Sequence, residues 1–346
     1  MVMLGVDAHK ATHTVVATDL NGCELERVTV RALDAGHVEA LAWAAKWPER
    51  TWAIEDCRQF TRRLERALLV SGEAVVRVAP RLMAVSRQSG RQRGKSDPID
   101  ALAVARAAIR ERELPRACLD GPEREVRLLL DHREDLVAER TRVQNRLRWH
   151  LYELDPGAEP PARSLRHRRT LEQLRGALEG VPGTVARLAR ELVERIDGLN
   201  QSIDALEAEI TTLVEPMTPT LRTIPGCGAL NAAKLIAETA DVRRFRSAAA
   251  FAMHNGTAPI PVWSSNTPRH RLNRGGNRQL NCALHRIAVT QLRWDGPGRR
   301  YFDRRIAGGN TKKEALRALR RRLSDVVYQA LRADTASSAP RSEIAA

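Results

Sequence analysis

A strict spacing of aliphatic residues in the middle of the chain constrains its fold more than any other feature. From position 196 to position 213 these residues follow one another at intervals of 3, 4, 3, 4 and 3. They are Ile196, Leu199, Ile203, Leu206, Ile210 and Leu213. The spacing is typical of the a and d positions of a coiled coil, and the stripe is narrower than the apolar face of an ordinary core-facing helix. The segment therefore predicts a long helix that pairs with another helix.

A second long helix is predicted upstream. Its apolar residues fall mostly on one helical stripe and are Val126, Leu129, Leu136, Val143, Leu147, Leu151 and Leu154. The polar, proline-rich segment 155–170, DPGAEPPARSLRHRRT, interrupts the helix because proline cannot continue the hydrogen-bond pattern. Residues 120–215 thus predict a helical coiled-coil region with a break near 155–170. The two arms can pair with each other or with another subunit, and we expect some intermolecular contact.

The first 115 residues alternate between strand and helix patterns. Three strands are expected between residues 3 and 32, and Asn21-Gly22 closes the hairpin that leads into the third. A helix at 36–47, a strand at 51–57, a helix at 58–72 and a strand at 74–80 follow. Three strands in a meander followed by this alternation predict an α/β domain, compatible with a ribonuclease-H-like sheet. A generic α/β domain is the alternative.

Residues 216–332 predict a third, mainly helical domain. Ile224–Gly228 resembles the hairpin of helix-hairpin-helix modules, whose backbone N–H groups face phosphates, although a plain helix start explains it equally well. A loop at 257–279, a helix at 280–294 and a basic helix at 312–323 follow. Residues 333–346 are small and polar, and a disordered tail is expected there.

The charge balance favours a polyanionic partner. The 346 residues include 57 Lys and Arg against 42 Asp and Glu, a net charge of +15, and arginine supplies nearly all of the excess. Arginine suits phosphate because its planar fork binds two oxygens at once. Nucleic-acid binding is the favoured interpretation, and a solvated basic surface is the alternative.

Several classes of protein are disfavoured. The five cysteines are scattered and form no CxxC pair, so neither a zinc knuckle nor a disulfide framework is indicated. Asp7 and Lys10 interrupt the apolar start, which argues against a signal peptide, and no apolar run approaches the length of a membrane span. A cytoplasmic protein without a membrane partner is expected.

Four acidic residues stand where a metal site would need them. Asp7 and Glu55 each end a short apolar strand, while Asp97 and Asp100 open a helix after a basic stretch. Residues at i and i+3 share one helix face, although a helix start with Asp97 as N-cap and Pro98 as the first helical residue explains the pair as well. Asp56 competes with Glu55, because adjacent strand residues point to opposite faces.

The chemistry of such a set is well defined. Two divalent ions about 4 Å apart must be neutralised by several carboxylates that converge from different elements. Two strand acids and a helix pair provide that arrangement, and oxygen-only ligands favour Mg²⁺ or Mn²⁺. The order D…E…D-x-x-D is more specific than any of its members, each of which in isolation is more often a turn or cap residue.

Six segments together resemble one known family. They are GVDAHK, AIEDC, KSDPIDALAVARA, TIPGCG, FRSAAAFAMHNGTAPIPVWSSN and HRLNRGGNRQLNCALHRIA. In this order they resemble the IS one-ten (IS110) insertion-sequence transposases over nearly the whole chain. The resemblance implies a RuvC-like domain with a metal-binding DEDD tetrad, a coiled-coil region and a C-terminal transposase domain with a nucleophilic serine. The tetrad maps to Asp7, Glu55, Asp97 and Asp100, which selects Glu55 over Asp56.

The resemblance also implies partners and a nucleophile. Such proteins excise and insert their element by strand exchange between donor and target DNA, guided by a structured non-coding RNA. The family's serine loop usually reads proline, a few residues, serine, glycine. Here Ser265 stands in place of the glycine, so Ser264 is the better match for the nucleophile and Ser265 is its rival. The alternative is that either hydroxyl only caps a turn and has no catalytic role.

Basic residues near these motifs complete the predicted site. Candidates for nucleic-acid contact precede the helix pair or follow the serine, and a homo-oligomer, dimer or tetramer, is the expected working species. The candidates are Arg91, Arg93, Lys95, His270, Arg271, Arg274 and Arg278.

Overall fold

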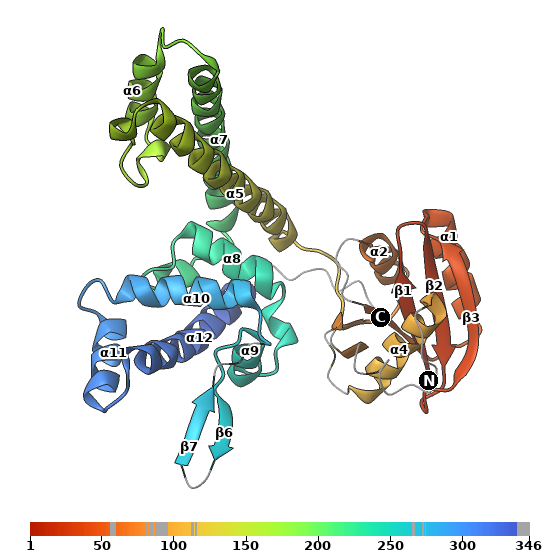
Figure 1. Ribbon diagram of the computed structural model, residues 1–346. Coiled ribbons are helices and arrows are strands. Elements are labelled where there is room, and N and C mark those ends of the chain that lie inside the picture. Colours follow the sequence, from red (N-terminus) through yellow and green to blue (C-terminus); the bar gives the residue numbers. More distant parts are fainter. Residues whose placement is uncertain are drawn as a thin grey trace. The chain divides into compact units, whose positions relative to one another are not determined.

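The computed structural model describes most of the chain as two compact units. The described residues are 1–55, 60–80, 82–83, 86, 96–111, 114, 116–264, 267–271, 273 and 275–337. The first unit runs from Met1 to Asp120, and the second begins at Gly121. The second unit contains both the helical arms and the C-terminal helices (Figure 1), where the sequence predicted two separate parts.

A five-stranded mixed sheet organises the first unit. Its strands are β1 (Val2–Ala8), β2 (Thr12–Thr18), β3 (Glu24–Arg31), β4 (Arg50–Glu55) and β5 (Val75–Val78). The order is β3-β2-β1-β4-β5, with β1, β2 and β3 antiparallel and β1, β4 and β5 parallel. The predicted meander followed by helix–strand alternation is confirmed, and with it the α/β class of this unit.

Helices cover both faces of the sheet because its strands are apolar on both sides. Leu4 and Val6 pack with the helices on one face, whereas Met3 and Ala53 pack with the helix on the other. The first face carries α1 and α2, and the second carries α4. Their bounds are α1 (Asp34–Ala44), α2 (Arg62–Val70) and α4 (Asp97–Arg110).

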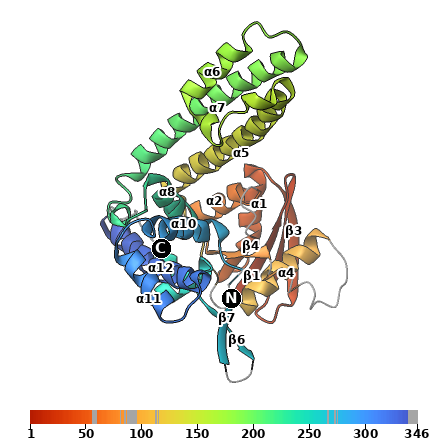
Figure 2. The same ribbon diagram turned by 60° about the vertical axis from the view of Figure 1, so that its left-hand side comes forward.

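The predicted helical region is an antiparallel hairpin formed within one chain. Helix α5 (Glu123–Leu154) and helix α7 (Thr184–Val214) lie side by side, and Figure 2 shows α6 (Arg168–Leu178) at the far end of this arm. Ion pairs cross between the two long helices, one joining Arg133 to Glu207 and another joining Arg195 to Glu139. The proline-rich break contains two short 3-10 turns, Pro156–Ala158 and Ser164–Arg166.

The aliphatic seam is covered by the arm's own partner helix. Ile196, Leu199, Ile203 and Ile210 are buried without any second subunit, and Leu206 is half-buried. At the outer end Leu147 and Leu151 pack into one cluster with Ile196, and at the base Val126 packs with Ile210. Of the two pairings that the sequence left open, the structure therefore shows the one within a single chain, and the expected contact with another subunit stays a prediction.

The base of the arm and the C-terminal helices share one core. Val126 and Ile210 from the arm belong to the same buried cluster as Phe251, Leu284 and Leu323. The α-helices after the arm are α8 (Ala229–Thr239), α9 (Ala248–His254), α10 (Arg278–Gln291), α11 (Pro297–Ala307) and α12 (Lys312–Ser337), and 3-10 turns lie at Leu221–Thr223 and Val242–Arg244. In the part of the chain that the structure describes, no helix is long and apolar enough to cross a membrane.

Helix α12 is longer than the sequence predicted. It continues to Ser337, so residues 333–337, expected in a disordered tail, are helical. Asp334 explains the extension, because its buried carboxylate accepts hydrogen bonds from the backbone N–H groups of Thr220 (2.7 Å) and Leu221 (3.0 Å). This contact fastens the last turns of α12 to the segment before α8.

The turn before α8 packs against α10. Gly226 adopts a left-handed conformation (φ 87°), and a Cβ at this position would lie 3.0 Å from the side chain of Thr290. Pro225 accepts a hydrogen bond through its carbonyl oxygen from Gln291 Nε2 (2.8 Å). A turn that tight needs glycine, since other residues rarely adopt this backbone conformation.

Leu199 gives a test of how the arm is stabilised. We expect Leu199→Ala to lower the free energy of unfolding by about 3 kcal/mol, because it removes a fully packed side chain, and Leu206→Ala to cost about 1 kcal/mol. Urea unfolding followed by circular dichroism measures both. The sedimentation coefficient should not change in either variant, and a variant that changes sedimentation while keeping wild-type stability would contradict pairing within one chain.

A buried histidine pair beneath the sheet predicts acid sensitivity. His13 stacks on His37, with ring centroids 5.4 Å apart, and three of their four ring nitrogens are buried without a hydrogen-bond partner. Burial lowers the pKa of both, that of His13 to about 4, although Asp34 beside His37 opposes the shift. Unfolded histidine binds protons near pH 6.5, so stability falls as the pH drops from there toward 4.

The expected loss between pH 6.5 and pH 5 is about 2 kcal/mol from His13 alone. His13→Phe/His37→Phe keeps the stacked pair and should flatten the dependence of the melting temperature on pH. His132→Gln, at an exposed position on α5, is the matched control and should leave the wild-type profile unchanged. Equal profiles for the double variant and the control would contradict this account.

Candidate active site

The end of β1 lies against the start of α4 because of a glycine. A Cβ placed on Gly5 would lie 2.2 Å from the carbonyl oxygen of Ala101 and 2.6 Å from the backbone nitrogen of Ala105. No real side chain tolerates such distances to backbone atoms, so only glycine lets α4 approach this closely. Since Asp7 follows Gly5 on the same face of the strand, it lies beside the first turn of α4.

Three side chains form a compact group at this point. His9 Nε2 lies 3.1 Å from Asp7 Oδ2 and 3.4 Å from Asp97 Oδ1. One ligand atom of each residue lies within 4.8 Å of the others, a spacing that could hold a metal ion. Asp7 is buried, whereas Asp97 and His9 are each about half exposed. The group thus has a fixed inner carboxylate and an open outer side.

The electrostatics of Asp7 are those of a crowded carboxylate. Burial raises its pKa, and the neighbouring charges of Asp100 and Asp97 raise it further, while His9 opposes the shift. Asp100 is itself buried (6% exposed). Like charges held together at low solvent exposure repel one another, and a divalent cation relieves that repulsion.

Glu55 lies on the neighbouring strand but outside the compact group. β1 and β4 are parallel with Val6 opposite Ile54, so Asp7 and Glu55 each follow that pair at the same edge of the sheet. Ala53 packs with α4, and strand alternation therefore places Glu55 on the same face as Asp7. Trp52 packs on the opposite face. Asp56 lies outside the described residues.

The helix that carries Asp97 and Asp100 begins one residue earlier than predicted. Ser96 is the N-cap residue of α4 and Asp97 is the first helical residue, so Asp97 does not cap the helix. Both carboxylates remain on the first turn, three residues apart. The predicted basic residues Arg91, Arg93 and Lys95 lie outside the described residues.

The predicted serine loop is a β-hairpin. β6 (Ile260–Ser264) pairs antiparallel with β7 (Thr267–Arg271), and Ser264 is opposite Thr267 in the last pair (Figure 1). Residues 257–279 were expected to form a loop. Pro261 is compatible with the observed strand, because a two-stranded ribbon has two free edges and proline is tolerated at a strand edge. Ser265 lies outside the described residues.

The predicted basic residues after the serine lie at the base of this hairpin. His270 and Arg271 are exposed on β7 and line a cavity of about 870 Å³ together with residues of α12. Arg278 is the first residue of α10 and is also exposed. Arg274 lies outside the described residues.

Sequence reasoning missed one member of the acidic site. His9 contacts both Asp7 and Asp97, yet the sequence analysis gave it no role. The sequence did contain one indication of this role. His9 comes two residues after Asp7, and residues two apart in an extended segment lie on the same side of the strand.

Two family models and one solved structure match parts of this chain. A family model described as "Transposase" and named for IS110 and its DEDD signature matches residues 4–156, and the model of the "Transposase IS116/IS110/IS902 family" matches residues 218–303. The T. thermophilus RuvC in complex with Holliday junction substrate aligns with 31% of this chain and 91% of that chain, at 14% identity and a TM-score of 0.25.

Three insertion-element proteins are similar over most of their length. The IS110 43.6 kDa protein of Streptomyces coelicolor is 31% identical over 70% of this chain and 71% of its own. The IS116 44.8 kDa protein of Streptomyces clavuligerus is 28% identical over 96% and 94%. The IS900 42 kDa protein of Mycobacterium paratuberculosis is 27% identical over 96% of each chain.

The two family models and the acidic group define a DNA-processing enzyme that depends on a divalent metal. The chain belongs to the IS116/IS110/IS902 family of transposases. DNA is accordingly its substrate, and the predicted family is confirmed. The comparisons match families and whole chains, so the roles of single residues stay predictions.

Metal binding should be visible in the thermal stability of the whole chain. We expect Mg²⁺ or Mn²⁺ to raise the melting temperature of the wild type, because an ion that binds only the folded state stabilises it. Asp7→Asn should lose that response. In chelator it should melt at or above the wild-type temperature, since the pKa of Asp7 is raised in the folded state and its ionised form costs stability at neutral pH.

Glu39→Gln is the matched control for this experiment. Glu39 is an exposed acid on α1, and its loss should leave the metal response unchanged. A wild-type melting temperature that ignores both ions, or an Asp7→Asn protein that still responds to them, would contradict a metal site at this position.

Proposed function

We propose that this transposase excises and inserts its element by DNA strand exchange with a serine nucleophile and a divalent metal held by the DEDD residues. The observation that carries the proposal is the group of Asp7, His9 and Asp97, with Asp100 beside it, at the edge of the sheet in the first unit. The resemblance of the PIPVWSSN segment to the family's serine motif supports Ser264 as the nucleophile.

The carboxylates suit the metal that such chemistry needs. Asp7, Glu55, Asp97 and Asp100 would hold Mg²⁺ or Mn²⁺, since hard cations prefer carboxylate oxygen. The bound ion would polarise the scissile phosphate and neutralise charge on it. Asp7 would fix the inner side of the site, because it is buried, while the exposed side of Asp97 would face the substrate.

The serine step would be a transesterification. The Oγ of Ser264 forms an ester bond to the scissile phosphorus and gives its proton to a base, and the bond from phosphorus to the leaving sugar oxygen breaks as that oxygen takes up a proton. Arg271, Arg274 and Arg278, with Arg91, Arg93 and Lys95 in the first unit, would hold the DNA backbone. Carboxylates and serine belong to different units, so both units must act on the same DNA.

A metal-dependent nuclease or resolvase is the second candidate. The same carboxylates could activate a water molecule in place of the serine, and no covalent intermediate would then form. The acidic group supports this reading as well as the first, because it contains no feature that requires the serine. Trapping of the intermediate separates the two.

Further parts of the proposal rest on the family resemblance. A structured non-coding RNA would guide donor and target recognition, and its co-purification with the protein, followed by sequencing, tests this. The working species would be a homo-oligomer in the cytoplasm, held by surfaces other than the buried arm seam. Sedimentation with and without DNA measures the oligomeric state.

Ser264 gives the decisive test of mechanism. We expect Ser264→Ala to abolish both the covalent protein–DNA adduct and strand exchange, while DNA binding stays within about tenfold of wild type, or about 1.4 kcal/mol. Ser264→Cys keeps a nucleophile of similar size and should retain some adduct. Denaturing gels with labelled DNA of the element's ends measure the adduct.

Ser265→Ala is the matched control and should keep at least partial activity. A dead Ser265→Ala protein beside an active Ser264→Ala protein would shift the nucleophile by one residue. Strand exchange in both variants would exclude the serine mechanism and leave metal-activated water as the better account.

A further inference from the structure

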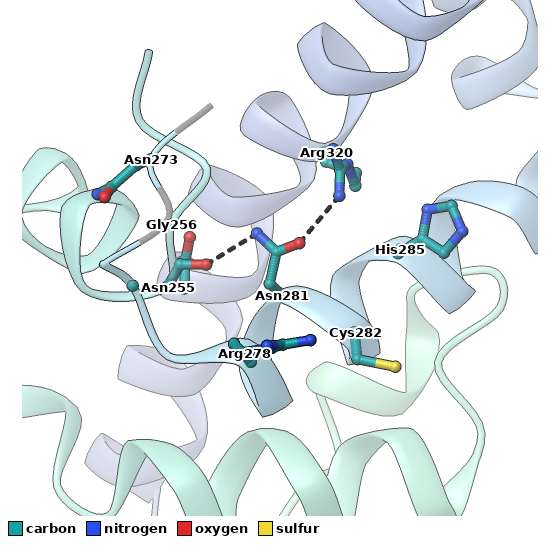
Figure 3. Close-up of a pocket in the computed structure, with 9 residues that line it drawn as sticks. Asn255, Gly256, Asn273, Arg278, Asn281, Cys282, His285 and Arg320 are labelled. Atoms are coloured by element: carbon teal, nitrogen blue, oxygen red, sulfur yellow. Dashed lines mark hydrogen bonds between the residues drawn. The ribbon is translucent and has the colours of Figure 1, made fainter. Parts of the chain in front are cut away.

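A cavity of about 500 Å³ in the second unit has a lining suited to an anion. Figure 3 shows amide and guanidinium side chains that enter it from α10, from α12 and from the turn after α9. Arg278 and Arg320 supply positive charge. Asn281 lies on α10 with its side chain toward Arg320 of α12, and His285 lies one turn further along α10. None of the described residues that line the cavity is acidic.

Arg320 is the unusual member of this set. Its Nη1 donates a hydrogen bond to Asn281 Oδ1 (2.9 Å), whereas its Nε is buried and has no hydrogen-bond partner. No carboxylate in the described part of the chain forms an ion pair with it. Burial lowers the pKa of its guanidinium, and the nearby charge of Arg317 acts in the same direction. Arginine stays charged at neutral pH, so the cavity contains a partly buried cation that has no counter-ion among the residues that the structure describes.

The wall around Arg320 is built from a connected set of hydrogen bonds. Asn281 Nδ2 donates to the carbonyl oxygen of Asn255 (3.0 Å), and the fully buried Asn255 donates through Nδ2 to Ser324 Oγ (2.8 Å). Asn281 therefore holds Arg320 in one orientation and is itself held by the turn after α9. A side chain fixed in this way loses little entropy when it binds a ligand.

Two glycines bring the remaining wall into place. A Cβ on Gly276 would lie 2.3 Å from the backbone nitrogen of Gly256, so the two backbone segments cross in direct contact. Gly256 also has a left-handed conformation (φ 73°). Close packing of the main chain thus fixes the shape of this part of the cavity wall. A patch of flexible arginines on an open surface would need no such packing.

The neighbouring Arg321 on α12 differs from Arg320. Arg321 forms an ion pair with Asp325, which compensates its charge within the chain. Arg320 also lines the larger cavity at the base of the β6–β7 hairpin, where His270 and Arg271 lie. The uncompensated charge is therefore next to the surface that the serine hairpin borders.

We propose that this cavity binds one backbone phosphate of a DNA strand, with Arg320 as its two-pronged anchor and Arg278 as a second cation. The guanidinium fork matches two phosphate oxygens, and a phosphate would supply the missing counter-charge. The proposal rests on the proposed function only in taking DNA as the strand that enters this surface. It requires neither the serine nor a metal ion.

DNA binding in chelator tests the pocket separately from catalysis. Fluorescence anisotropy of the full-length chain with duplex DNA, at several salt concentrations, gives the affinity and its salt dependence. We expect Arg320→Gln to weaken binding at least tenfold and to lower the log–log salt slope by about 0.9, the effect of one lost phosphate contact. Arg320→Lys keeps the charge without the fork and should fall between this variant and the wild type.

Arg286→Gln is the matched control, an exposed arginine on α10 that does not line the cavity. It removes the same charge and should weaken binding less than threefold. Equal losses of DNA affinity for Arg286→Gln and Arg320→Gln would overturn the proposal. The same measurement with single-stranded RNA of equal length is a second check, and a loss of affinity seen only with that RNA would also overturn it. If Arg320→Gln fails to fold, Arg278→Gln, at an exposed position, and Arg320→Lys decide the same question.

Inorganic phosphate provides a second measurement. It should raise the melting temperature of the wild type and of Arg286→Gln more than that of Arg320→Lys, and equal increases would count against the pocket. Because these readouts need no cleavage, a failed serine mechanism would leave them intact. A failed pocket would likewise leave the covalent adduct as a test of the serine.

Discussion

The contact of α4 with β1 over Gly5 sets the geometry of the acidic site. The absent side chain lets the backbone of α4 reach the strand, and the first turn of the helix then lies beside Asp7. Asp97 and Asp100 are placed by this contact, whereas Asp7 and Glu55 are placed by the parallel register of β1 and β4. Carboxylates from a sheet edge and from a helix can converge in this fold only if the two elements touch closely.

The two units use buried charge of opposite sign in a similar way. In the first, Asp7 and Asp100 are buried close enough that their charges repel. In the second, Arg320 is partly buried without a counter-ion among the described residues. Repulsion between the two carboxylates, and burial of the guanidinium, each lower the folding stability of the ligand-free protein. Binding of an ion of opposite charge would offset that cost at either place. Such local conflict between stability and charge is typical of functional sites.

The helical arm contributes to the stability of the second unit and not to the cavities that would bind ligands. α5 and α7 bury the seam within one chain, and their base continues into the core formed by α8, α10 and α12. The surfaces at the β6–β7 hairpin and the Arg320 cavity are thereby left for ligands. An arm whose seam is already satisfied also leaves its outer faces open to other subunits, which agrees with a proposed assembly that does not depend on the seam.

Local pattern was enough to predict the α/β order of the first unit, the two long helices, and the places of Asp7 on a strand and of Asp97 and Asp100 at a helix start. Strand alternation, helical periodicity and helix-start signals act over only a few residues, whereas the role of these acids stays a prediction. Tertiary structure alone decided which helix covers the seam, since a and d positions look the same whichever chain supplies the partner. It also added His9 to the acidic group, turned the proline-containing serine segment into a hairpin, and left Arg320 without a counter-ion. Those features depend on contacts between residues far apart in the chain, which no local pattern records.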